Sequence, residues 1–355
     1  MKRLGSLIGA CLSATLLSGC GGSSNGSAAM SVAPPVGEHR SSAVGSAPLP
    51  ALGPNLYVGN YFGNTVTVYA PGSGSVLRTI SQGIRAPDPL AFDGSGNLYV
   101  ANDLGNTVTV YPPGGTSVLR TISQGVRVPD GLAFDGTGNL YVADCASCDT
   151  SGPSTVTVYA PDSTSVLRTI SRGLKEPDAL AVDGAGNLYV ANDDVYTSTV
   201  TVYAPGKTRL RRTISQGVSG PAALAFDGSG NLYVANSYFA STVTVYAPGS
   251  GSVLRTISQG VNDPRGLAFD ASGNLYVANL GGNTVTVYAP GSTSVQRTIT
   301  QGMSEPFNLA FSASGNLFVS NPGNNTVTVY APGSTKLRRT ISEGLNMPGS
   351  LAFGP

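Results

Sequence analysis

From residue 55 onward, short runs of Val, Ile, Leu, Thr, Tyr and Phe alternate with short runs of Gly, Pro, Asn and Asp. None of the apolar runs shows the three- to four-residue spacing of an amphipathic helix. Short β-branched and aromatic runs that end at turn residues are typical of β-strands. The pattern therefore predicts an all-β structure over residues 55–355.

The strand-like runs repeat. The sequence Asn-Leu-Tyr-Val or a near copy occurs seven times, 42 to 48 residues apart, starting at Asn55, Asn97, Asn139, Asn187, Asn231, Asn274 and Asn316. Each unit carries four runs, which in the second unit cover residues 98–100, 107–111, 118–122 and 132–134. A period in the low forties with four strands is typical of a propeller blade. The sequence thus predicts a seven-bladed β-propeller with four-stranded blades.

The two ends of the repeat region are complementary. The first unit begins at Asn55 without a preceding Leu-Ala-Phe run, and a spare copy of that run lies at residues 351–353. We expect this C-terminal strand to pair beside the first strand and to close the ring, which leaves no open sheet edge at the seam.

Two repeated features have structural explanations. The run from Asp93 to Asn97 predicts a tight hairpin, in which Asp accepts backbone hydrogen bonds and Gly adopts a positive φ. The Arg of each Arg-Thr-Ile run is expected on the outermost strand, as a solvent-facing charge that opposes edge pairing; these are Arg78, Arg120, Arg168, Arg212, Arg255, Arg297 and Arg339.

Residues 1–19 have the pattern of an export signal, with Lys2 and Arg3 before a short apolar stretch. The signal ends in Leu-Ser-Gly before Cys20, which resembles the lipobox of bacterial lipoproteins. The resemblance implies that Cys20 carries lipid, that the protein is anchored in the bacterial cell envelope, and, since Gly21 rather than Asp follows, that the membrane is the outer one. Residues 20–54 are rich in Gly, Ser, Ala and Pro and predict a flexible tether.

The repeat itself has a family resemblance. Its motif, Pro-x-x-Leu-Ala-Phe-Asp-x-x-Gly-Asn-Leu-Tyr-Val-Ala-Asn-x-x-x-Asn-Thr-Val-Thr-Val-Tyr, resembles the NHL repeat and is similar to the YVTN-type propeller repeats of bacterial envelope proteins. The resemblance covers residues 55–355. Most members of these families are binding or scaffolding modules, and some are enzymes. The resemblance therefore implies the fold more firmly than the function.

The amino-acid composition excludes some classes of function. The formal net charge of +1 excludes a basic nucleic-acid binder. The single histidine, His39, lies in the tether, so the propeller offers no histidine for a catalytic triad. Residues 88–194 hold 13 acidic and 5 basic residues, a net charge of −8, whereas residues 195–355 hold 5 and 10, a net charge of +5. Charge is therefore uneven around the ring.

Residues that break the repeat are the candidates for a local site. We expect the loops before the innermost strands and those between the second and third strands to share one face, at the mouth of the channel. In the acidic half this face would carry Asp88, Asp103, Asp130, Asp144, Asp149, Asp178, Asp193 and Asp194, with the aromatic residues Tyr61, Phe62, Tyr196, Tyr238 and Phe239 nearby. Converging carboxylates favour a divalent cation such as calcium, or a basic ligand. Alternatively, these Asp residues cap loops or pair with Arg85, Arg127 and Lys175.

Cys145 and Cys148 are the two cysteines that remain after the signal is removed and Cys20 is acylated. An oxidising envelope favours a disulfide between them, with a metal or redox role as the alternative.

The sequence therefore predicts a monomeric, lipid-anchored interaction or ligand-binding module. Its partner would be a protein, a peptide or a small cationic ligand at the channel mouth, and no catalytic residues are identifiable. The alternative is a metal-dependent lactonase or hydrolase that resembles the gluconolactonase-type propellers. The six blades usual in that family argue against it.

Overall fold

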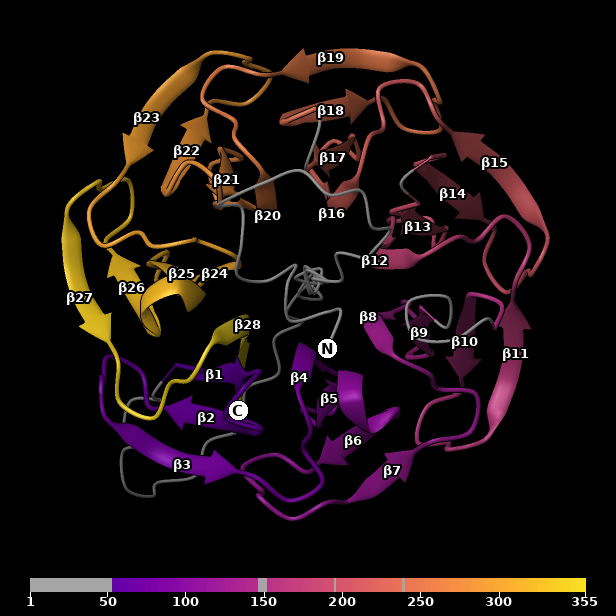
Figure 1. Ribbon diagram of the computed structural model, residues 1–355, viewed down its shortest axis with the longest axis horizontal. Coiled ribbons are helices and arrows are strands. Elements are labelled where there is room, and N and C mark those ends of the chain that lie inside the picture. Colours follow the sequence, from indigo (N-terminus) through magenta and orange to yellow (C-terminus); the bar gives the residue numbers. More distant parts are fainter. Residues whose placement is uncertain (1–52, 146–151, 195, 238–239) are drawn as a thin grey trace, which may run out of the picture.

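The computed structural model describes residues 53–145, 152–194, 196–237 and 240–355. These residues form seven antiparallel sheets of four strands each, and Figure 1 shows the sheets arranged as blades around a ring. The predicted seven-bladed β-propeller is confirmed. We number the blades 1 to 7 in the order of their second strands.

The strands occupy four positions from the centre of the ring to its rim. Innermost, from blade 1 to blade 7, are β28 (Pro348–Gly354), β4 (Pro87–Phe92), β8 (Pro129–Phe134), β12 (Pro177–Val182), β16 (Pro221–Phe226), β20 (Pro264–Phe269) and β24 (Leu309–Phe311). The second strands are β1 (Asn55–Asn60), β5 (Leu98–Asn102), β9 (Leu140–Asp144), β13 (Leu188–Asn192), β17 (Leu232–Asn236), β21 (Leu275–Asn279) and β25 (Leu317–Asn321).

The third strands carry the Thr-Val-Thr-Val-Tyr runs: β2 (Thr65–Tyr69), β6 (Thr107–Tyr111), β10 (Thr155–Tyr159), β14 (Thr199–Tyr203), β18 (Thr242–Tyr246), β22 (Thr284–Tyr288) and β26 (Thr326–Tyr330). The outermost are β3 (Val76–Ile80), β7 (Arg120–Ile122), β11 (Val166–Ile170), β15 (Leu210–Ile214), β19 (Val253–Ile257), β23 (Val295–Ile299) and β27 (Leu337–Ile341). Two short 3₁₀ turns, η1 (Asp103–Gly105) and η2 (Pro322–Asn324), follow β5 and β25.

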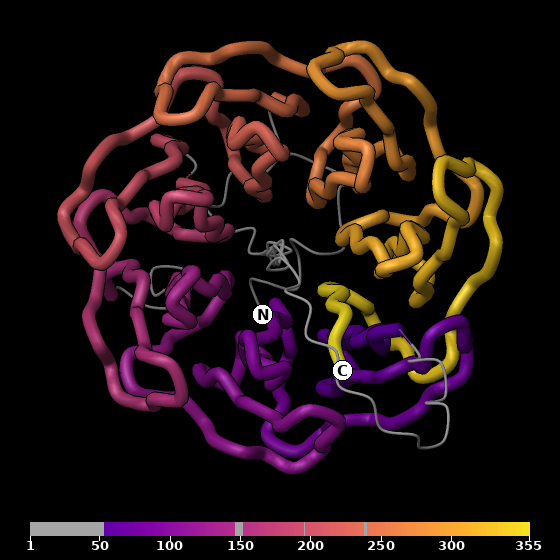
Figure 2. Tube along the Cα trace, turned by 180° about the vertical axis from the view of Figure 1, so that it is seen from behind, coloured from indigo at the N-terminus to yellow at the C-terminus, as the bar shows by residue number. Residues whose placement is uncertain are grey.

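The ring closes as the repeat count predicts. Strand β28 pairs antiparallel with β1, and Leu351 lies opposite Val58 while Phe353 lies opposite Leu56. In Figure 2 the yellow C-terminal strand lies beside the indigo first strand, within one blade. The two ends of the repeat region are thus joined by backbone hydrogen bonds, and blade 1 is built from both of them.

The hydrophobic core lies between blades. One cluster joins Tyr57, Val68 and Ile80 of blade 1 to Leu98 and Tyr111 of blade 2, and equivalent clusters fill the other interfaces. Both faces of the three inner strands of each sheet are therefore buried, which explains why these strands are mostly apolar on both sides.

The predicted hairpin between the first two strands of a blade is also confirmed. The Asp93 carboxylate accepts hydrogen bonds from the backbone N–H groups of Ser95 and Asn97, each at 2.9 Å. Gly96 adopts a φ of +81°, which a residue with a side chain rarely adopts.

The repeated arginines lie on the outermost strands as predicted, but five of them contact tyrosine rings instead of standing as solvated charges. Arg78 is half-buried, its Nη2 donates a hydrogen bond to the Tyr57 hydroxyl at 2.5 Å, and its guanidinium lies 5.6 Å from the Tyr57 ring centroid. Arg120, Arg168, Arg255 and Arg297 lie over tyrosine rings in the same way. The exposed residues of β3 are Leu77 and Thr79. These arginines therefore stabilise the blades through cation–π contacts with tyrosine rings and are not fully solvated charges.

Within the described residues, the helices are too short to span a membrane.

Candidate functional site

Two sets of loops meet at one end of the propeller, as predicted. The N–H of Asp103, after the second strand of blade 2, donates to the carbonyl of Ala86, just before the innermost strand, at 3.1 Å. The N–H of Ala86 also donates to the side chain of Asn64 in blade 1, at 2.8 Å. The loops that break the repeat are thus tied together within and between blades.

A ring of asparagines at this end escaped the sequence analysis. The Asn102 carbonyl oxygen accepts from the Arg85 N–H at 3.0 Å, and its amide donates to the Thr109 hydroxyl at 3.1 Å. Equivalent asparagines anchor the same loop in five other blades: Asn60, Asn192, Asn236, Asn279 and Asn321. Blade 3 has Asp144 at this position. The signal was present in the sequence, as an Asn at the fifth position of each run that begins Leu-Tyr-Val or Leu-Phe-Val, which becomes Asp once.

Asp144 therefore has a structural position rather than the predicted position on the mouth surface. It is 1% exposed, and its Oδ1 accepts from the Arg127 N–H at 3.0 Å. Burial raises the pKa of Asp144 to about 8, although hydrogen bonds from Arg127 and Thr157 oppose the shift. The side chain replaces an asparagine inside the blade.

The contacts of Asp144 indicate a protonated carboxyl group. Thr157 Oγ1 lies 2.9 Å from Asp144 Oδ2 and 3.0 Å from the Gly125 carbonyl oxygen. A hydroxyl has one proton to donate, so both contacts are hydrogen bonds only when Asp144 itself carries a proton. In blade 5 the neutral Asn236 makes the same pair of contacts through Thr244.

Three of the predicted residues, Asp88, Asp130 and Asp178, stand at the start of the innermost strands of blades 2, 3 and 4. We call them the acidic arc. All three are more than nine-tenths buried. Electrostatic interaction joins Asp178 to Asp88 two blades away, and to Arg265 two blades away on the other side. Its carboxyl group therefore faces the interior of the ring.

The acidic arc contains carboxyl oxygens without partners. Both oxygens of Asp178 and Oδ1 of Asp88 are buried and accept no hydrogen bond from the residues that the structure describes. Burial raises the pKa of both side chains well above its usual value, and the charge of Asp130 raises both further. Buried carboxylates are ordinarily hydrogen-bonded or paired, so these oxygens indicate a group that the described residues do not supply.

The arc has charged neighbours in the adjoining loops. Asp103 adds negative charge beside Asp88 and accepts a hydrogen bond from the Tyr61 hydroxyl at 2.6 Å. Asp193 lies beside Asp178, and burial raises the pKa of Asp193 to about 7. Across the ring, Arg265 pairs with Asp263 at 3.2 Å. The structure thus brings Asp103 and Asp193 to the arc.

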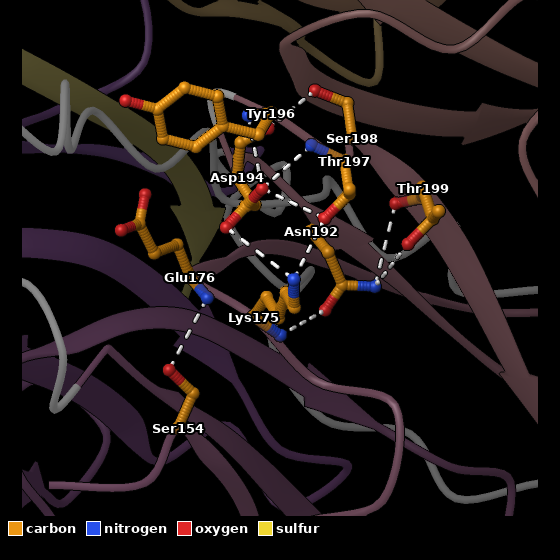
Figure 3. A network of polar contacts seen from close by, with 9 residues as sticks. All are labelled: Ser154, Lys175, Glu176, Asn192, Asp194, Tyr196, Thr197, Ser198 and Thr199. Atoms are coloured by element: carbon orange, nitrogen blue, oxygen red, sulfur yellow. Dashed lines mark hydrogen bonds and ion pairs between the residues drawn. The ribbon is translucent and has the colours of Figure 1, made fainter.

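Asp194 belongs to its own loop. Its Oδ1 accepts from the backbone N–H groups of Tyr196 and Thr197, and its Oδ2 lies 3.9 Å from Lys175 Nζ. Figure 3 shows this network, in which the Asp194 carboxylate is enclosed by its own loop and Lys175. For Asp194 the alternative interpretation, loop capping with pairing to Lys175, describes the structure.

The predicted aromatic residues are placed differently from one another. Tyr61 and Phe62 form an edge-to-face pair with centroids 5.6 Å apart, next to Asp103. Tyr196 is 87% exposed, at the tip of its loop. Tyr238 and Phe239 lie outside the described residues.

Other predicted residues also fall outside the described part of the chain, namely Asp149, Cys148 and the N-terminal segment with Cys20. Cys145 is disulfide-bonded. Its pairing with Cys148 stays a prediction.

The metal hypothesis finds no support in the geometry. Within residues 53–145, 152–194, 196–237 and 240–355, no three His, Cys, Asp or Glu side chains are grouped so that they could hold a metal ion. Calcium needs six to eight oxygens at 2.3–2.6 Å from one point. The carboxyl groups of the arc interact with one another without converging in that way.

Comparisons with known proteins inform the fold. No protein-family model and no curated protein sequence matches the chain. Among solved structures, the chain is similar to a functionally unknown protein from Desulfotomaculum acetoxidans DSM 771, at 16% identity and a TM-score of 0.71, over 85% of this chain and 99% of that one. It is also similar to the WD40 β-propeller domain of Doa1, at 13% identity and a TM-score of 0.66, over 81% and 92% of the two chains. At these identities the likeness concerns the fold alone.

Proposed function

We propose that this protein is a lipid-anchored interaction module of the bacterial cell envelope, and that it binds a cationic group of a protein, a peptide or a small molecule at the acidic arc. The β-propeller fold supports a generic interaction module. The observation that carries the cationic ligand is the set of buried, unpartnered oxygens of Asp88 and Asp178.

The charges around the arc favour a cation. Asp88, Asp103, Asp130, Asp178 and Asp193 bring five carboxyl groups into one region. The basic side chain that faces them, Arg265, also pairs with Asp263. A bound cation would relieve the repulsion between these carboxyl groups and occupy the open acceptor atoms.

Changing Asp88, Asp130 and Asp178 together to Asn is the direct test. The native protein and the triple variant are titrated with the tripeptide Gly-Arg-Gly and with calcium chloride by isothermal calorimetry. We expect the native protein to bind the peptide and the triple variant to bind it at least about 30-fold more weakly, since losing one partner of a buried charge pair costs about 2 kcal/mol or more.

The triple variant also controls for folding. Asn has nearly the same shape as Asp and is neutral in a buried position without holding a proton, so the variant should melt at or above the native temperature. A triple variant that binds the peptide as well as the native protein does, or a native protein that does not bind the peptide whether or not it binds calcium, would contradict the proposal.

The membrane anchor is tested separately. We expect Cys20→Ser to move the protein from the membrane fraction to the soluble fraction, because the lipid chains that Cys20 would carry supply the attachment. Fractionation of cells that express each form, followed by immunoblotting, measures this change. An unchanged membrane fraction would exclude Cys20 as the anchor.

A further inference from the structure

The open acceptor atoms of the arc are distributed over two blades. Oδ1 of Asp88 is on β4 in blade 2, and the two oxygens of Asp178 are on β12 in blade 4, with Asp130 on β8 between them. A ligand that satisfies all of them must carry several hydrogen-bond donors that point in different directions.

Among the described residues, the charges around Asp88 and Asp178 are mostly negative. Asp88 faces Asp103 from η1 and Asp130 from β8. Asp178 faces Asp193 from the loop after β13, Asp130 from β8, Asp88 from β4 and Arg265 from β20. At the equivalent positions stand Ala222 in β16, Gly349 in β28 and Phe307 just before β24, none of which is charged. The carboxyl groups that face Asp88 or Asp178 thus number four, namely those of Asp88, Asp103, Asp130 and Asp193. One basic side chain, Arg265, faces Asp178 among the described residues.

Neighbouring carboxyl groups in such a setting hold protons until another positive charge replaces them. Burial and mutual repulsion both favour the neutral form of Asp88 and Asp178. A cation bound between them reverses the preference, because an opposite charge within hydrogen-bond distance favours the ionised carboxylate.

The geometry selects the kind of cation. A metal ion needs its ligands around one point, and the described residues contain no group of three acidic, histidine or cysteine side chains arranged for that. A guanidinium group has five N–H donors in a planar fork, and a primary ammonium group has three donors. Either can donate hydrogen bonds to more than one carboxyl group at once.

We propose that the acidic arc binds an organic cation with several N–H donors, a guanidinium or a primary ammonium group, in exchange for protons held by Asp88 and Asp178. This inference rests on the proposed function and specifies its ligand class and its dependence on pH. On binding, each carboxylic acid loses its O–H proton to the solvent, and the carboxylate that remains accepts an N–H hydrogen bond from the ligand.

Proton release is measurable by calorimetry. The purified protein is titrated with methylguanidinium chloride at pH 7 in phosphate and in HEPES, whose ionisation enthalpies differ, and the difference in observed heat counts the protons released. We expect about one to two protons per ligand. The titration repeated at pH 6 should show binding weaker by about tenfold for each proton released, as linkage requires.

Tetramethylammonium is the matched probe, since it has the same charge but no N–H donor. We expect it to bind at least about tenfold more weakly than methylguanidinium. Asp178→Asn should reduce both the affinity and the number of protons released. Asp162→Asn is the control variant, because this exposed carboxylate pairs with Arg120 on the outer rim and should leave both quantities unchanged.

The outcomes separate the two proposals. If Gly-Arg-Gly and methylguanidinium bind without proton release, or if tetramethylammonium binds equally well, the inference is wrong and the proposed function stands. If no cation binds, both are wrong. If Asp178→Asn melts below the native protein, Asp88→Asn provides the second measurement, and unchanged proton release in that variant would overturn the exchange.

Discussion

Removing residues 347–355 is expected to lower the melting temperature by roughly 10 °C or more, or to prevent folding. The deletion removes β28, the innermost strand of blade 1, and exposes the edge of β1. It also removes Leu351 from the core, and the Phe353 ring that packs edge-to-face against Phe318 at 5.1 Å. Burying each such side chain contributes about 1.5–3 kcal/mol, and the lost ladder of hydrogen bonds adds to that.

A circular permutant tests whether the lower melting temperature comes from the loss of strand β28 or from the altered chain ends. In blade 2, Phe92 and Asn97 are joined by Asp-Gly-Ser-Gly, and Phe353 and Asn55 occupy the equivalent places in blade 1. Residues 347–353 joined through Asp-Gly-Ser-Gly to Asn55 should therefore restore the blade and the native melting temperature, as followed by circular dichroism. A truncated protein that melts like the native one would show that closure by β28 contributes little.

Replacing Asp144 with Asn should stabilise the protein strongly at alkaline pH and have no effect below about pH 4. The pKa of Asp144 is about 8 in the folded protein and near 3.8 when the chain is unfolded. Between these values the folded state holds a proton that the unfolded state has released, so stability falls as pH rises from 4 to 8 and then levels off. One pKa unit corresponds to about 1.4 kcal/mol, so the gain from Asn amounts to several kcal/mol at pH 8.

The other blades provide the reverse experiment. Asn102 makes the same hydrogen bonds in blade 2 that Asp144 makes in blade 3. Asn102→Asp should therefore destabilise the protein at pH 8 and leave it unchanged below pH 4. Denaturant unfolding of both variants at pH 4, 6 and 8 measures the free energy of unfolding. Equal free energies for native protein and Asp144→Asn at all three values would mean that Asp144 is not buried as a neutral acid.

The local sequence pattern was sufficient to predict the architecture. Each blade repeats the same four runs and packs against its neighbours, so strand positions, blade number and the pairing of residues 351–353 with β1 were predictable from the repeat. The repeated arginines lie on the outermost strands as predicted. The prediction that they are solvated charges was wrong for Arg78, because its partner, Tyr57 of the second strand, is 21 residues away in the sequence.

The sequence by itself determined the fold, the closure of the ring and the end at which the irregular loops and the acidic residues gather. The tertiary structure alone decided what each aspartate does. Asp144 and Asp178 look alike in the sequence, yet one is hydrogen-bonded inside a blade, while the other faces carboxyl groups and an arginine of other blades. Burial and electrostatic environment depend on neighbours that are distant in the chain, whereas strands and turns depend on residues close in sequence.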